Sequence, residues 1–193
     1  MEEDLLRLST DLGDDVVLTQ LIGRHASTLM ALNRFEDVVA HLEDGLEVAR
    51  EMQDLELENA CLAMLSEVEQ RIGRFDNAVD RQRDLINVEE RLGNMPAAAA
   101  DAVHYGSTLL TLGRLEDARD VFERAIQLAE DAGDQRVAQR AYGGLGVTLS
   151  AMKHPVDALD NLMQALEIAR QTQDLAHEAQ WLGSIGEALW KYD

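Results

Sequence analysis

The sequence predicts an all-α fold, an α-solenoid built from repeated helical hairpins. Three observations lead to this prediction. One pair of junction residues recurs every 40 residues, a second turn marker recurs with the same period, and the apolar residues between them follow helical spacing. The composition agrees, because the 193-residue chain has only two prolines and 4% aromatic residues.

The first marker predicts the junctions between successive hairpins. At each recurrence Gly or Gln precedes Asp or Asn, which is the pattern of a helix end followed by the N-cap of the next helix. We therefore expect a single array over residues 1–193 that contains four complete hairpins, at residues 14–53, 54–93, 94–133 and 134–173. The N-cap positions are Asp14, Asp54, Asn94, Asp134 and Asp174.

The second marker predicts the turn inside each hairpin, at residues 33–35, 73–75, 113–115 and 153–155. In all four, Asp or Glu follows in the first turn of the second helix and complements the helix dipole. The fourth has Pro155 there, which is tolerated at a helix start. Each hairpin is thus expected to contain two helices of similar length.

The two ends of the sequence hold half-repeats. Residues 1–13 resemble the second helix of a hairpin without its first helix, and residues 174–193 resemble a first helix without its second. Two interpretations stay open. The chain is either a fragment of a longer array or an array that uses half-repeats as caps.

Charge and composition exclude several classes of function. The net charge of −20 repels phosphate backbones and anionic lipid headgroups, so neither nucleic acid nor membrane is expected as a partner. The charge suits a basic partner, although solubility alone also explains it. The single cysteine, Cys61, excludes an internal disulfide and a cysteine-based zinc site. The acidic amino terminus does not resemble a signal peptide, and we expect a cytoplasmic protein.

The repeat columns resemble those of the tetratricopeptide repeat family, over essentially the whole chain. The resemblance rests on small residues in the middle of each first helix and on Ala or Val early in each second helix. The 40-residue period resembles the long-helix subclass, which includes Leu-Gly-Asn repeat proteins, kinesin light chains and bacterial signalling regulators. The small first-helix residues are Ala26, Ser66, Gly106, Gly146 and Gly186, and the second-helix residues are Val38, Ala78, Ala118 and Ala158.

This resemblance implies a right-handed superhelix whose first helices line a concave groove that binds protein. Two known ligand classes do not carry over, because the Lys, Asn and Arg set of chaperone-binding repeats is absent and Gly144 and Val147 replace peptide-reading asparagines. The mostly small, apolar groove would suit a helix or an apolar peptide, although packing alone could also explain the small residues. The implied groove residues are Gln20, Arg24, Ser27, Met64, Glu67, His104, Ser107, Arg140, Gly144, Val147, Gln180 and Ser184.

Four polar residues occupy columns that are apolar in other repeats: Glu69, Gln82, Glu89 and Asp101. Burying such groups without partners costs several kcal/mol. Three interpretations stay open for them: a local network with Arg71, Arg81 or Arg83, a weak hinge, or a functional polar pocket. No nucleophile, metal-ligand set or cofactor motif accompanies them, so we expect no catalysis, no metal and no cofactor.

The last half-repeat is expected to expose an apolar patch, because its partner helix is absent from the sequence. Its residues, Trp181, Ile185, Leu189 and Trp190, would allow a homodimer through this end. Two functional hypotheses follow. The first is a non-catalytic scaffold that binds a peptide or helix of a partner. The second is a sensor or regulatory segment of a larger signalling ATPase or transcription regulator.

Overall fold

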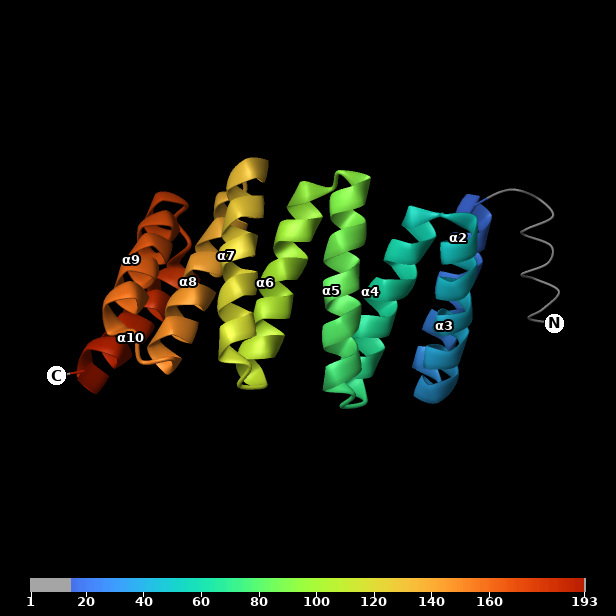
Figure 1. Cartoon of the computed structure of the whole chain (residues 1–193), viewed down its shortest axis with the longest axis horizontal. Coiled ribbons are helices and arrows are strands. Elements are labelled where there is room, and N and C mark those ends of the chain that lie inside the picture. Colours follow the sequence, from blue (N-terminus) through green and yellow to red (C-terminus); the bar gives the residue numbers. More distant parts are fainter. Residues whose placement is uncertain (1–14, 193) are drawn as a thin grey trace. The chain divides into compact units, whose positions relative to one another are not determined.

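The computed structural model describes residues 15–192, and every regular element in this range is an α-helix (Figure 1). The predicted all-α fold class is therefore confirmed. The chain divides into two compact units, Met1–Gly93 and Asn94–Asp193, and the boundary lies at a predicted hairpin junction. The half-repeat expected at residues 1–13 and the N-cap expected at Asp14 lie outside the described residues.

Unit 1 contains two helical hairpins. The first consists of α2 (Asp15–Ala31) and α3 (Phe35–Met52), and the second consists of α4 (Leu55–Arg71) and α5 (Phe75–Leu92). Helix α4 contacts both α3 and α2, so the two first helices of the unit, α2 and α4, lie next to each other.

Unit 2 contains two hairpins and one further first helix. Helices α6 (Met95–Thr111) and α7 (Leu115–Ala132) form one hairpin, and α8 (Gln135–Ala151) and α9 (Pro155–Gln171) form the other. Helix α10 (Leu175–Tyr192) follows as the first-type helix that the last half-repeat predicts. Helix α8 contacts both α6 and α10, so the three first helices of this unit are neighbours.

The junctions between hairpins have the geometry that the first marker predicts. Gly93 and Gly133 end their helices with φ of 74° and 68°, in the left-handed region that glycine adopts most readily. Gln53 and Gln173 adopt the same region, with φ of 57° and 55°. At the next helix start, the Asp134 carboxylate accepts hydrogen bonds from the backbone N–H of two residues, at 3.0 and 3.1 Å.

The core of each unit lies between its first and second helices. In unit 1 it includes Leu42, Leu57 and Leu65, each of which is fully buried. In unit 2 Phe122 of α7 is 1% exposed, and Leu162 of α9 is fully buried. Burying side chains of this size contributes roughly 1.5–3 kcal/mol each, which is the main stabilisation available to hairpins that cannot fold alone.

Glycines on α6 and α8 make room for the aromatic ring of Phe122. A Cβ on Gly144 would lie 2.3 Å from the Phe122 ring, and a Cβ on Gly106 would lie 2.9 Å from it. The ring is thus enclosed by two helices at positions where any side chain would collide with it. The close approach of Phe122 accounts for glycine at position 144.

Candidate protein-interaction surface

The surface of interest is formed by the solvent-facing sides of the first helices, which we call the first-helix surface of each unit. In unit 1 it lies on α2 and α4, where Gln20, Arg24, Ser27 and Glu67 are exposed and Met64 is half-buried. Met64 packs against the hydrophobic core, so only part of its side chain is available for contacts with another molecule. The structure thus brings the five groove residues predicted in this unit to two adjacent helices.

In unit 2 the first-helix surface lies on α6, α8 and α10. His104 and Ser107 on α6 and Gln180 on α10 are exposed. The remaining residues predicted for this surface are half-buried: Arg140, Gly144, Val147 and Ser184. The predicted positions on the central helix, α8, are therefore all half-buried, whereas α6 and α10 each have at least one that is exposed.

Several predicted groove residues have internal contacts of their own. The Ser27 and Ser107 hydroxyls each donate a hydrogen bond to the backbone carbonyl one turn earlier, at 2.8 Å. Val147 packs against the core of unit 2, and Gly144 receives the Phe122 ring. Packing therefore explains the small or apolar character of Gly144 and Val147 without any ligand.

The C-terminal patch differs from its prediction at Trp181. This side chain is 4% exposed, and a Cβ on Gly143 of α8 would lie only 2.2 Å from its ring. Trp181 is thus a core residue of unit 2 and is not available for self-association. Ile185 is half-buried, whereas Leu189 and Trp190 are 52% and 83% exposed.

Acidic charge is unequally distributed between first and second helices. Helices α3 and α7 each contain six Asp or Glu residues, against one Arg in α3 and two in α7. Helix α8 contains two arginines and no acidic residue, and Asp101 is the only acidic residue of α6. The sequence predicted overall acidity, but only the assignment of residues to helices shows that the first helices of unit 2 carry little of it.

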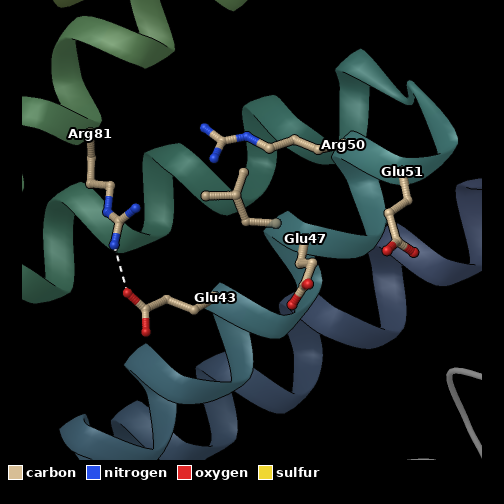
Figure 2. A pocket seen from close by; sticks show the side chains of 6 residues that line it. Glu43, Glu47, Arg50, Glu51 and Arg81 are labelled. Atoms are coloured by element: carbon tan, nitrogen blue, oxygen red, sulfur yellow. Dashed lines mark hydrogen bonds and ion pairs between the residues drawn. The ribbon is translucent and has the colours of Figure 1, made fainter.

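An open pocket of about 550 Å³ lies between α3 and α5 on the acidic side of unit 1. Figure 2 shows Arg81 directed toward Glu43, with Glu47, Glu51 and Arg50 around the remaining rim. The Arg81–Glu43 ion pair is 2.7 Å long, and Arg50 pairs with Glu58 at 2.9 Å. These arginines are already neutralised by the protein, so the pocket presents mainly carboxylates and resembles a salt-bridged surface more than a ligand cavity.

The polar residues predicted at core positions of unit 1 are buried. Glu69 is fully buried, Gln82 is 6% exposed, and Glu89 is 4% exposed. The Glu69 carboxylate lies 3.5 Å from the Arg81 guanidinium and accepts a hydrogen bond from Asn77 at 3.5 Å. A local network with Arg81 is therefore the interpretation that the structure supports for Glu69.

Burial raises the pKa of Glu69 above its ordinary value of 4.5, and Arg81 and Asn77 offset part of this effect. The folded state therefore binds the proton more tightly than the unfolded chain does. It follows that the ionised carboxylate weakens unit 1 at neutral pH, and that this penalty disappears as the pH falls from the raised pKa toward 4.5.

We expect Glu69→Gln to remove this pH dependence. The stability of the native protein relative to the Gln variant should improve as the pH is lowered toward 4.5, since only the native protein has the titrating group. Amide hydrogen exchange in α4 and α5, measured for both proteins across this pH range, would report the difference. A stability difference that stays constant with pH would contradict the assignment.

No group of His, Cys, Asp and Glu residues in the part of the chain that the structure describes could hold a metal ion. Between residues 15 and 192, no helix combines the length and apolar character needed to cross a bilayer. The glycines of α8 lie inside a helix, and two of them, Gly143 and Gly144, are covered by aromatic rings.

Comparison with known proteins supports the repeat assignment. Residues 96–171 match a family model described as tetratricopeptide repeat. Comparison with curated proteins gives no match. Among solved structures, the chain resembles a signal transduction ATPase with numerous domains from Pyrococcus horikoshii that has a tetratricopeptide repeat sensor. The TM-score is 0.76 at 14% identity, over 91% of this chain and 27% of that protein.

Two further structures have the same fold. BtubC (BKLC) from P. vanneervenii gives a TM-score of 0.72 at 19% identity, over 97% of this chain and 78% of that one. A kinesin light chain with nearly identical tetratricopeptide-like repeats from Podosopora anserina gives 0.66 at 13% identity, over 89% and 86%. The family match covers residues 96–171, and the helical-hairpin fold of the described residues agrees with it.

Proposed function

We propose that the chain is a non-catalytic interaction module that binds a peptide or helix of a partner protein on its first-helix surface. The observation that carries the proposal is the exposure of polar side chains there. His104 and Ser107 on α6 and Gln180 on α10 face solvent on two first helices of unit 2 that both contact α8. Exposed polar positions on a rigid helical scaffold are typical of recognition surfaces.

The charge distribution supports a ligand that is not strongly basic at this surface. Arg136 and Arg140 give α8 a positive charge, and α6 has one acidic residue. A basic segment would interact more favourably with the acidic second helices α3 and α7. A helical or apolar peptide with a neutral or acidic face fits the first-helix surface of unit 2 better.

The test begins with a peptide selected from a displayed random library against the purified protein. Its affinity is then measured for the native protein and for Ser107→Trp, which places a bulky ring on the first-helix surface. Because Ser107 is exposed, the fold should tolerate this ring, and we expect at least about a tenfold loss of affinity, which corresponds to 1.4 kcal/mol.

Gln127→Trp on α7 is the matched control, since Gln127 is an exposed residue of a second helix in the same unit. Its affinity should remain close to that of the native protein. If Gln127→Trp weakens binding and Ser107→Trp does not, the ligand lies on the second helices and the proposal is wrong.

A second candidate is a sensor segment of a larger signalling protein. The observation that favours it is the likeness to the Pyrococcus ATPase, of which the chain spans 27% of the length and which has a tetratricopeptide repeat sensor. The coding sequence on both sides of residues 1–193 distinguishes the candidates. A nucleotide-binding motif in the same reading frame would support the sensor, and stop codons close to both ends would exclude it.

A further inference from the structure

We propose that α10 carries a self-association seam through which two copies of the chain pair in antiparallel orientation. The seam consists of Leu175, Ala179, Leu182, Gly186 and Leu189, which recur at alternating steps of four and three residues. This spacing keeps apolar residues on one stripe of a helix and is the pattern of a coiled-coil contact. The seam lies on the opposite side of α10 from Gln180 and Ser184, the α10 residues assigned to the first-helix surface of the proposed function.

All five seam residues face solvent in the structure. Leu175, Leu182 and Leu189 are 76%, 47% and 52% exposed, and Ala179 and Gly186 are exposed as well. Trp190 lies beside the seam and is 83% exposed. The three leucines on one stripe, with Trp190 beside them, form an apolar patch that a single chain leaves in contact with water.

The same face is covered on the preceding first helix. Gly146 of α8 lies 40 residues before Gly186, and a Cβ on it would lie 2.7 Å from Leu162 of α9. Leu149, the counterpart of Leu189, is 8% exposed. A Cβ on Gly186 would meet nothing within 4 Å. The space beside Gly186 is therefore open, whereas α9 fills the equivalent space beside Gly146.

Large and small residues alternate along the seam in a way that complements an antiparallel copy of itself. When two seams are aligned so that Leu182 of one copy faces Gly186 of the other, Leu189 faces Ala179. Leu182 and Leu189 then each lie opposite a small residue, and two helices with this alternation can approach closely. This self-complementarity is the reason that we assign the seam to a second copy rather than to an unrelated helix.

The charge of the chain favours the same surface. Two copies that each carry a charge of −20 repel each other, so they must meet where acidic residues are few. The seam contains none. Of the two acidic residues elsewhere on α10, Glu178 is paired with Arg170 at 2.9 Å, and Glu187 is exposed outside the seam. By contrast, a contact through α3 or α7 would bring two strongly acidic helices together.

The contact involves one face of one helix from each copy, which is smaller than a standard interface of about 1,600 Å². The proposal therefore predicts a reversible dimer whose population rises with concentration. Sedimentation equilibrium of the full chain, from micromolar to near-millimolar concentration, should show the mass increase from 21.4 kDa toward twice that value. A mass that stays at the monomer value throughout would overturn the proposal.

Leu182→Glu should keep the protein monomeric, because it places a charge at the centre of the seam. Met163→Glu on α9 is the matched control, since Met163 is 58% exposed on a helix of the same unit, and it should dimerise like the native protein. If the native protein dimerises and Leu182→Glu does so equally well, the seam is not the interface and the proposal is wrong.

Disulfide trapping tests the register. In the proposed pairing, residue 179 of one copy lies opposite residue 189 of the other copy. The double variant Ala179→Cys/Leu189→Cys therefore places cysteines opposite each other across the interface. The two positions lie about 15 Å apart along one helix, at 1.5 Å per residue, so they cannot form a bond within one chain. The native Cys61 is fully buried and its thiol pKa is raised to about 12, which keeps it unreactive.

Mild oxidation should convert the double variant to a covalent dimer and leave each single variant monomeric. Covalent dimers formed equally well by both single variants would show a parallel arrangement and would overturn the antiparallel pairing. Binding of the selected peptide to Leu182→Glu should match that of the native protein. This control separates failure of the seam from failure of the first-helix surface.

Discussion

Replacing Arg81 with methionine is expected to lower the free energy of unfolding of unit 1 by about 3–5 kcal/mol, because the change leaves Glu69 buried without its cation. Glu69 is fully buried, and Arg81 is 3.5 Å from its carboxylate. Both tryptophans lie in unit 2, so the loss should be followed by amide hydrogen exchange in α4 and α5 rather than by tryptophan fluorescence.

The matched control for this prediction is Arg83→Met. Arg83 is 56% exposed and pairs with Asp80 at 3.1 Å on the surface of the same helix, so its loss should cost less than about 1 kcal/mol. Adding Glu69→Leu to Arg81→Met should restore most of the lost stability, because an apolar side chain needs no cation. Equal, small effects for Arg81→Met and Arg83→Met would show that Glu69 does not depend on Arg81.

Replacing Phe122 with alanine is expected to destabilise unit 2 by about 3–5 kcal/mol, because it removes the ring that fills the space between α6, α7 and α8. Phe122 is 1% exposed, and Gly106 and Gly144 enclose its ring. Urea unfolding can be followed by tryptophan fluorescence here, since Trp181 is 4% exposed within the same unit.

The effect of Gly144→Ala should change sign with this substitution. In the native protein it should cost about 1–3 kcal/mol, because the new methyl group collides with Phe122 and the ring has no free side to move toward. In the Phe122→Ala background the same change should stabilise the helix by up to about 1 kcal/mol.

Gly183→Ala is the control for this cycle. A Cβ at Gly183 meets nothing within 4 Å, so the change should be neutral or stabilising in both backgrounds. If Gly144→Ala stabilises the native protein as Gly183→Ala does, the higher helix propensity of alanine outweighs any collision of its methyl group with Phe122. The packing explanation for the glycines of α8 would then be wrong.

The helices could be predicted closely because the signals that start and end them are local. Asp54, Asn94 and Asp134 were predicted as N-caps. The Asp54 and Asp134 side chains accept hydrogen bonds from the first turn of the following helix, whereas the Asn94 side chain makes no such bond. A capping residue and the φ of the residue before it depend on a few neighbouring residues. These neighbouring residues lie close together in the sequence, so each junction could be predicted independently of the others.

The roles of individual side chains were less predictable, because they depend on neighbours far along the chain. The repeat pattern placed Gly144 either in a ligand-binding groove or in a packing contact. Only the structure shows that the contact is with Phe122, a residue of the preceding hairpin. Trp181 was expected on an exposed patch, but its ring packs against Gly143. The exposed leucines Leu175 and Leu182 belonged to the same helical pattern and could have been found from their seven-residue spacing.

Photo-crosslinking of the bound, library-selected peptide tests whether the first-helix surface of unit 2 is the binding site. A photoreactive amino acid is placed at Ser107 of α6 or at Gln180 of α10, and, for comparison, at Gln127 of α7 or at Met163 of α9, all of which are exposed. We expect peptide adducts from the α6 and α10 positions and none from the α7 and α9 positions. Adducts formed only at Gln127 and Met163 would contradict this expectation and would assign recognition to the second helices.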